Sequence, residues 1–277
     1  MMSALKSFVP SLIRRRMKNY LTNRRKVRLF GTLAPLVPDV EAMFDGPPTL
    51  EEFKANGEEF LTIYREIAHL QPNERMLDVG CGIGRKTLPL TQYLNEHAAY
   101  QGIDITKAGV DWCRERITPK FPNFQFLHID VYNKLYNPDG KSRPSEYRFP
   151  FVDKSFDFVM LGSVFTHMLP DDLENYLSNV RRVLTAKGRC LITYFLLNEE
   201  SDRLITAGRS TLDLKHVFDE YRSVSLEKPE LAVAFSETWI KGLYKKLGLR
   251  IQRVDYGSWC GRVDYRSYQD LVLATRD

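Results

Sequence analysis

The sequence has no long hydrophobic run: no stretch approaches the roughly 20 apolar residues that a membrane-spanning helix needs. Cysteine is scarce, and Cys81, Cys113, Cys190 and Cys260 form no CxxC pair and have no histidine neighbour at zinc-ligand spacing. A disulfide scaffold is therefore excluded, and reduced thiols in a cytoplasmic protein are expected. Hydrophobic residues make up 43% and charged residues 27% of the 277 positions, which is typical of a folded globular domain.

Acidic residues are missing from the first 38 positions. Residues 1–30 hold nine cations: Lys6, Arg14, Arg15, Arg16, Lys18, Arg24, Arg25, Lys26 and Arg28. The other residues hold 31 Lys and Arg against 35 Asp and Glu and so carry −4. This acidic body argues against a nucleic-acid-binding fold, which favours a basic face. The basic arm, with apolar residues among its cations and Pro10 as an interruption, suits peripheral contact with an anionic membrane; a cleaved transit peptide and a solvated tail are the alternatives.

The pattern along the chain predicts three parts. Residues 1–30 form the basic, partly helical arm, residues 31–70 a proline-containing linker and a helix over 51–70, and residues 71–277 the main domain. Within that domain short apolar runs alternate with helical stretches, which predicts strands at 75–79, 99–103, 124–129, 156–161 and 189–195 and helices at 86–95, 108–117 and 172–184. Such alternation indicates an α/β fold with a mainly parallel sheet and helices on both faces. A helix at 237–247 and a pair of antiparallel strands at 250–256 and 268–274 follow, and insertions at 132–150 and 197–236 are expected to be functional loops or lids.

A glycine-rich turn follows the first of these strands, in the run Asp78-Val79-Gly80-Cys81-Gly82-Ile83-Gly84. Glycine lets the backbone approach a ligand closely, and the following helix N-terminus favours an anionic group. The turn lacks the lysine of a P-loop, and Arg85 stands where a dinucleotide loop needs glycine or alanine. Asp104 and Asp130 end the next two strands, at the sheet edge where ligands bind. They are placed to accept hydrogen bonds from ribose hydroxyls and from an adenine amino group, respectively.

At these residues the sequence resembles the class I S-adenosylmethionine-dependent methyltransferases, over roughly residues 55–275. The resemblance implies a Rossmann-like, seven-stranded sheet that ends in an antiparallel strand pair, and S-adenosylmethionine as the cofactor. It also implies the cofactor-binding residues Asp78, Gly80, Cys81, Gly82, Gly84, Arg85, Asp104, Ile105, Asp130, Val131 and Gly162. Arg85 would pair with the cofactor carboxylate or serve only as a solvated helix cation. The arrangement is similar to stand-alone enzymes that methylate small molecules and glycans.

The acceptor side follows the fourth strand, where His167 is the best-placed base. The alternative is a structural histidine that supports the loop. Aromatic and cationic residues gather in both insertions and near the C-terminus, which suits a polar or anionic acceptor: Tyr132, Tyr136, Arg143, Tyr147, Arg148, Arg209, Lys215, His216, Tyr221, Arg222, Trp259, Arg262 and Tyr265. Asp171 and Asp172 fit a helix start better than a metal site, so no metal is expected.

These patterns predict methyl transfer to the oxygen of a small molecule, a saccharide or a lipid-linked saccharide. The alternatives are an RNA methyltransferase, in which the basic arm contacts phosphates, and a non-enzymatic member of the fold that binds the cofactor for structure. The predicted location is cytoplasmic, with association to a membrane through residues 1–30.

Overall fold

The computed structural model describes residues 11–46 and 49–276, so the predicted interruption at Pro10 lies outside the described residues. Helix α1 (Ser11–Phe30) is followed by the short 3-10 helices η2 (Gly31–Leu36) and η3 (Val40–Ala42) and by helix α2 (Leu50–Glu66). Thr49 begins α2, because its side-chain oxygen accepts a hydrogen bond from the backbone N–H of Glu52. The linker and the helix expected over residues 31–70 are thus present.

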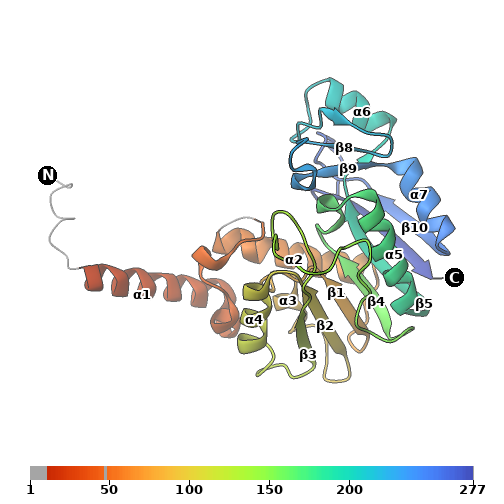
Figure 1. The fold of residues 1–277 in the computed structure, drawn as a ribbon. Coiled ribbons are helices and arrows are strands. Elements are labelled where there is room, and N and C mark those ends of the chain that lie inside the picture. Colours follow the sequence, from red (N-terminus) through yellow and green to blue (C-terminus); the bar gives the residue numbers. More distant parts are fainter. Residues whose placement is uncertain (1–10, 47–48, 277) are drawn as a thin grey trace, which may run out of the picture.

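Seven strands form the main sheet: β1 (Arg75–Val79), β2 (Ala99–Asp104), β3 (Phe124–His128), β4 (Phe156–Leu161), β5 (Leu184–Tyr194), β10 (Leu249–Asp255) and β11 (Asp270–Arg276). Their order is β10-β11-β5-β4-β1-β2-β3. Neighbouring strands from β5 to β3 run parallel, whereas β11 pairs antiparallel with β5 and with β10. The predicted seven-stranded, mainly parallel sheet with a final antiparallel pair is confirmed (Figure 1).

Helices cover both faces of this sheet (Figure 1). Helices α2, α3 (Thr87–Leu90) and α4 (Lys107–Arg116) contribute buried side chains to the apolar cluster on one face. Helices α5 (Pro170–Val183) and α7 (Glu237–Lys246) contribute to the cluster on the other. The side chains that line the sheet therefore lie between two apolar layers, as parallel strands require.

Several boundaries differ from the sequence prediction: α2 ends at Glu66 rather than at residue 70, and β11 covers Asp270–Arg276 rather than 268–274. The largest differences are at α3 and β5. Helix α3 ends at Leu90 rather than near residue 95, and the hydroxyl of Thr91 donates to the carbonyl oxygen of Leu88 at 2.7 Å, a local bond that competes with helix continuation. Strand β5 begins at Leu184, five residues early, because Leu184 already pairs with Phe156 before the register shifts. The turn around Lys187, which has φ 66°, is thus absorbed into the strand.

The second insertion is folded rather than a loop. It contains β6 (Leu196–Leu197), α6 (Glu199–Thr206), β7 (His216–Val217), β8 (Tyr221–Ser223), η5 (Pro229–Leu231) and β9 (Val233–Ser236). The four strands form a small sheet in the order β6-β9-β8-β7. Val233 and Phe235 are fully buried in the same cluster as the main sheet, so the small sheet is part of one core.

Candidate active site

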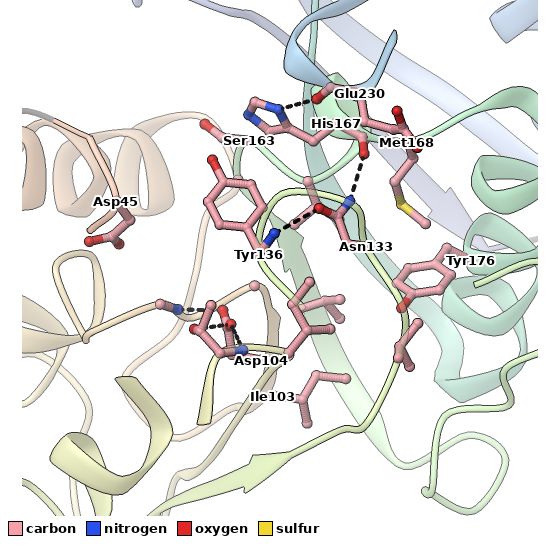
Figure 2. Close-up of a pocket in the computed structure, with 18 of the residues that line it drawn as sticks. Asp45, Ile103, Asp104, Asn133, Tyr136, Ser163, His167, Met168, Tyr176 and Glu230 are labelled. Carbon is pink, nitrogen blue, oxygen red and sulfur yellow. Dashed lines mark hydrogen bonds between the residues drawn. The ribbon is translucent and has the colours of Figure 1, made fainter. Parts of the chain in front are cut away.

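A cavity of about 840 Å³ opens at the carboxyl ends of β1, β2 and β4. Strand β1 lies between β4 and β2, and the chain leaves β1 toward β2 on one side but returns to β4 on the other. This is the topological switch point at which open α/β sheets bind ligands. In Figure 2, Asp45 and Tyr176 face the cavity from opposite sides, with Asp104 at its floor.

The glycine turn lines the cavity at Gly80 and Gly82. Their φ angles are 83° and 56°, in the left-handed region that favours glycine. A Cβ added to Gly80 would clash with Val164, and one added to Gly82 would meet the carboxylate of Asp45. Each position therefore needs glycine for its conformation, and a larger residue would also displace a neighbouring side chain.

Asp104 is only 8% exposed and lines the cavity at the end of β2. Its carboxylate accepts hydrogen bonds from the backbone N–H groups of Gly82 and Thr106, both at 2.7 Å. These bonds fix the glycine turn against β2 and leave further lone pairs of the carboxylate for a ligand. Ile105 and Val131 line the cavity beside it.

Seven of the predicted cofactor residues line the cavity, namely Gly80, Gly82, Arg85, Asp104, Ile105, Val131 and Gly162, and four do not, namely Asp78, Cys81, Gly84 and Asp130. Asp78 is buried and accepts a hydrogen bond from the Tyr100 hydroxyl at 2.7 Å, and burial raises the pKa of Asp78 to about 6. Asp130 lies near Asn137 and Lys141 instead, at 3.4 and 3.9 Å. Asp78 thus bonds to the neighbouring strand β2, and Asp130 lies beside the cavity rather than within it.

Two cations follow the glycine turn. Arg85 donates to the backbone oxygen of Asp45, pairs with its carboxylate at 3.4 Å and lies 5.0 Å from the Phe53 ring centroid. Lys86, which the sequence analysis did not single out, lines the cavity and donates to the Gly162 carbonyl at 3.2 Å. Burial lowers the pKa of Lys86, with the nearby carboxylates of Asp78 and Asp45 acting in the opposite direction. The one sequence signal for Lys86 is its position in the first turn after the glycines.

His167 lies at the other end of the cavity, in the 3-10 helix η4 (Phe165–His167). Its Nδ1 lies 2.8 Å from the carbonyl oxygen of Glu230 in the small sheet's η5. The Tyr136 ring meets the imidazole edge-on at a centroid distance of 5.7 Å (Figure 2). Burial lowers the pKa of His167 below its ordinary value. His167 therefore lines the cavity, as a base must, and also bonds to the backbone, as the structural alternative expects.

Two polar residues that the sequence analysis missed hold this region together. Asn133 donates to the His167 carbonyl at 3.3 Å and accepts from the backbone N–H of Tyr136 at 3.1 Å (Figure 2). Ser163, at φ 64°, donates to Gln269 at 3.0 Å and so links the end of β4 to the loop before β11. Left-handed backbone at a non-glycine residue costs energy and is concentrated at functional sites.

Most of the aromatic and cationic residues that were expected to contact the acceptor do not line the cavity. Only Tyr132, Tyr136 and Arg143 line the cavity among those named for it in the described part of the chain. Trp259 is fully buried and donates to Asp270 at 2.7 Å, and Arg262 pairs with the same carboxylate at 3.2 Å. These two side chains stabilise the loop before β11, which corrects their expected contact with the acceptor.

The remaining features concern histidines, thiols and acids. His128 lies in β3 with its Nε2 3.1 Å from the carbonyl oxygen of Ile105, as a structural histidine should. All four cysteines are free and buried.

Asp171 and Asp172 occupy the first turn of α5, as predicted, and Asp172 also lines the cavity. Among the described residues, no three His, Cys, Asp or Glu side chains are grouped so as to hold a metal ion.

Comparison with known proteins identifies related chains. Residues 70–222 match the family model of a methyltransferase domain. The chain is 30% identical over 154 residues to a phthiotriol/phenolphthiotriol dimycocerosates methyltransferase of Mycobacterium ulcerans (strain Agy99), a match that covers 54% of this chain and 49% of that protein. The chain thus spans about half the length of this curated relative.

Solved structures share the fold. A protein from Pyrococcus horikoshii OT3 superimposes with a TM-score of 0.56 at 17% identity, over 91% of this chain and 99% of that one. A magnesium protoporphyrin IX methyltransferase from Synechocystis PCC 6803 with bound S-adenosylhomocysteine superimposes with a TM-score of 0.52 at 16% identity, over 86% of this chain and 92% of that one. At these identities the likeness concerns the arrangement of the chain.

Proposed function

The chain belongs to the methyltransferase-domain family, and we propose that it takes S-adenosylmethionine as its methyl donor and methylates a hydroxyl group of a small molecule, a saccharide or a lipid-linked saccharide. The bound cofactor supplies an electrophilic methyl group on a sulfonium. The protein must then bind this cofactor, orient the acceptor oxygen in line with the methyl group and remove the hydroxyl proton.

The cavity residues fit this cofactor. Asp104 offers a carboxylate to ribose hydroxyls, and Ile105 and Val131 offer apolar walls to the adenine ring. Lys86 offers a half-buried cation to the cofactor carboxylate, and Gly80 and Gly82 of the turn place no side chain in the space beside it. Arg85 is held by Asp45 and Phe53, so we propose that it anchors the segment that covers the cofactor.

The proposal that His167 is a general base rests on its hydrogen bond with the carbonyl oxygen of Glu230. A carbonyl oxygen only accepts, so Nδ1 must carry the proton and Nε2 is left as the acceptor nitrogen. Burial lowers the His167 pKa, which keeps the imidazole neutral near pH 7. A neutral imidazole in the cavity with a fixed tautomer is the form that can accept a hydroxyl proton.

The polar groups at the His167 end favour a neutral, hydroxyl-bearing acceptor over an anionic one. Asp172 and Glu230 line this end, and burial raises the pKa of Asp172, with like charge from Asp171 and Glu230 acting in the same direction. The cation Arg143 is 78% exposed at its side chain and so compensates little. Carboxylates accept hydrogen bonds from hydroxyl groups and repel phosphate or carboxylate groups, which argues against a phosphorylated glycan and against nucleic acid.

A screen of acceptor extracts with methyl-labelled cofactor tests the proposal. The expected product is a small molecule or glycan that carries the label on oxygen, identified by mass spectrometry and by stability of the ether to mild acid. Label on RNA in the same extract, or on nitrogen or carbon of a small molecule, would contradict it.

A further inference from the structure

Helix α1 extends away from the body of the molecule (Figure 1). Its C-terminal end is firmly attached. The buried Nζ of Lys26 donates to the Val37 carbonyl at 2.8 Å and pairs with Asp39 at 2.7 Å, and Arg25 pairs with Glu51 of α2 at 2.5 Å. The C-terminal end of α1 is thus held against the segment that leads to the cavity.

Exposed apolar side chains lie on the part of α1 that can be described. Tyr20, Leu21 and Val27 are 59%, 58% and 60% exposed. Tyr20 and Val27 are seven residues apart and so share one side of the helix. The buried Lys26 marks the side that faces the body, and this apolar side points elsewhere. Leu21 lies about 100° further around the helix, and Arg24 and Arg28 lie in the arc between Leu21 and Tyr20. The exposed side of the helix therefore carries apolar and cationic side chains together.

The charge of α1 is strongly one-sided. Its 20 residues hold eight cations and no acidic residue: Arg14, Arg15, Arg16, Lys18, Arg24, Arg25, Lys26 and Arg28. Residues 31–277 carry −4, so the positive charge is concentrated on the projecting element and the body repels anionic surfaces weakly. Cations that surround exposed apolar residues on a helix suit the interface of an anionic bilayer.

We propose that α1 is a docking helix that binds the surface of an anionic lipid bilayer. Its apolar side chains enter the headgroup region, and its cations contact lipid phosphates and carboxylates. A nucleic acid would satisfy the cations alone and would leave Tyr20, Leu21 and Val27 in water. No helix among the described residues is long and apolar enough to span a bilayer, so this contact is peripheral.

The docking helix is continuous with the wall of the cavity. The chain passes from α1 through η2 and η3 to Phe44 and Asp45, which line the cavity, and Arg85 holds Asp45 in place. Phe44, Tyr132, Tyr136 and Tyr268 line the same cavity and are themselves 39–44% exposed. These apolar side chains suit an acceptor that is drawn from a lipid surface, a step that rests on the proposed methyl transfer, whereas the docking itself does not.

Cosedimentation of the full chain with vesicles tests the docking. We expect the chain to bind phosphatidylcholine vesicles that contain 30% phosphatidylglycerol and to leave them in 0.5 M salt, and to bind pure phosphatidylcholine weakly. The double variant Arg24→Glu/Arg28→Glu should weaken binding to the anionic vesicles by at least about tenfold. Leu21→Ser/Val27→Ser should weaken it by several-fold without changing the salt dependence.

The matched control is Lys107→Glu/Lys245→Glu, which makes the same charge change at exposed positions of α4 and α7. It should bind within about twofold of the unchanged chain. Equal loss in the control, equal binding to neutral and anionic vesicles, or displacement from the vesicles by RNA at the same phosphate concentration would overturn the proposal. S-adenosylhomocysteine binding confirms the fold of each variant. Docking without any methyl transfer would contradict the proposed function and leave the docking helix in place.

Discussion

We expect cofactor affinity to depend strongly on Lys86, a residue that the sequence motifs do not indicate. Its ammonium group is half-buried at the cavity wall, lies 4.7 Å from the Phe60 ring centroid and donates to the Gly162 carbonyl. A half-buried cation beside an anionic ligand group makes a strong charge-assisted bond. We predict that Lys86→Met weakens S-adenosylhomocysteine binding about 10- to 100-fold by calorimetry.

Lys107→Met is the control for Lys86, because Lys107 is 71% exposed at its side chain on α4 and pairs only locally with Asp111. It should bind as tightly as the unchanged chain. Equal affinities for all three proteins would show that Lys86 does not contact the cofactor. A thermal melt of the Lys86 variant separates loss of contact from loss of fold.

Asp104 has two functions, and one substitution should remove both. Asp104→Ala removes the proposed ribose contacts, at roughly 1.5–3 kcal/mol for each hydrogen bond to a charged group, and leaves the N–H groups of Gly82 and Thr106 without their acceptor. We predict weaker cofactor binding together with a lower melting temperature. Asp104→Asn should give a cofactor affinity and a melting temperature between those of the unchanged chain and those of Asp104→Ala. The control Asp111→Ala should change neither quantity. Normal cofactor affinity in the alanine variant would refute the ribose assignment.

At the residue scale, the sequence predicts side chains whose positions follow from local geometry. Gly82 and Asp104 were predicted because a turn and a strand end determine where they lie. Lys86 and Asn133 were not, because their roles depend on contacts with segments 76 and 34 residues away. Trp259 and Arg262 were assigned to the acceptor because exposed and buried versions of such residues look alike in sequence.

At the element scale, strands with buried runs were predicted closely. The predicted ranges 75–79 and 156–161 coincide with β1 and β4. The small sheet was missed because its strands are two to four residues long and pair across turns. Such strands gain their stability from packing, here from Val233 and Phe235 in the common core, and leave almost no periodic pattern.

The loop before β11 depends on one buried ion pair. Asp270 is fully buried and accepts from the backbone N–H groups of Leu196 and Gly257, both at 2.6 Å, as well as from Trp259 and Arg262. We predict that Arg262→Met lowers the free energy of unfolding in urea by about 3–5 kcal/mol, because it leaves a buried carboxylate without its cation.

The pH dependence of that loss provides a second check. Burial raises the pKa of Asp270 to about 6 from an ordinary 3.8, so the folded state binds a proton more tightly than the unfolded state and is favoured as the pH falls through 6. Arg262 lowers the pKa of Asp270, so Arg262→Met should raise that pKa further, and the cost of the substitution should shrink as the pH falls toward about 6 and level off below it. Arg253→Met, which breaks an exposed pair with Asp255, should cost less than about 1 kcal/mol. A similar cost for both variants would refute the structural role of Arg262.

At the scale of the whole molecule, the order of the strands follows from the βαβ pattern, and the family follows from motifs in their order along the chain. The path of residues 31–46 does not, because its contacts with Arg85 and the glycine turn join segments about 40 residues apart. The meeting of both insertions at His167 is likewise a product of tertiary structure, since Glu230 is 63 residues away in sequence. Acceptor recognition therefore belongs to the scale that sequence patterns describe least.

In the proposed reaction His167 acts as a neutral base toward a hydroxyl acceptor. The most direct test is the pH dependence of the single-turnover rate with the acceptor from the labelled screen. For the unchanged chain the rate should rise to a plateau with one pKa below the ordinary 6.5 of histidine, because protonation at low pH fills Nε2. His167→Ala should lose this ionisation and about 10²–10⁴ of the rate while binding S-adenosylhomocysteine normally, and the exposed His97→Ala should lose neither. A His167→Ala profile that keeps both the plateau rate and the ionisation would contradict the account.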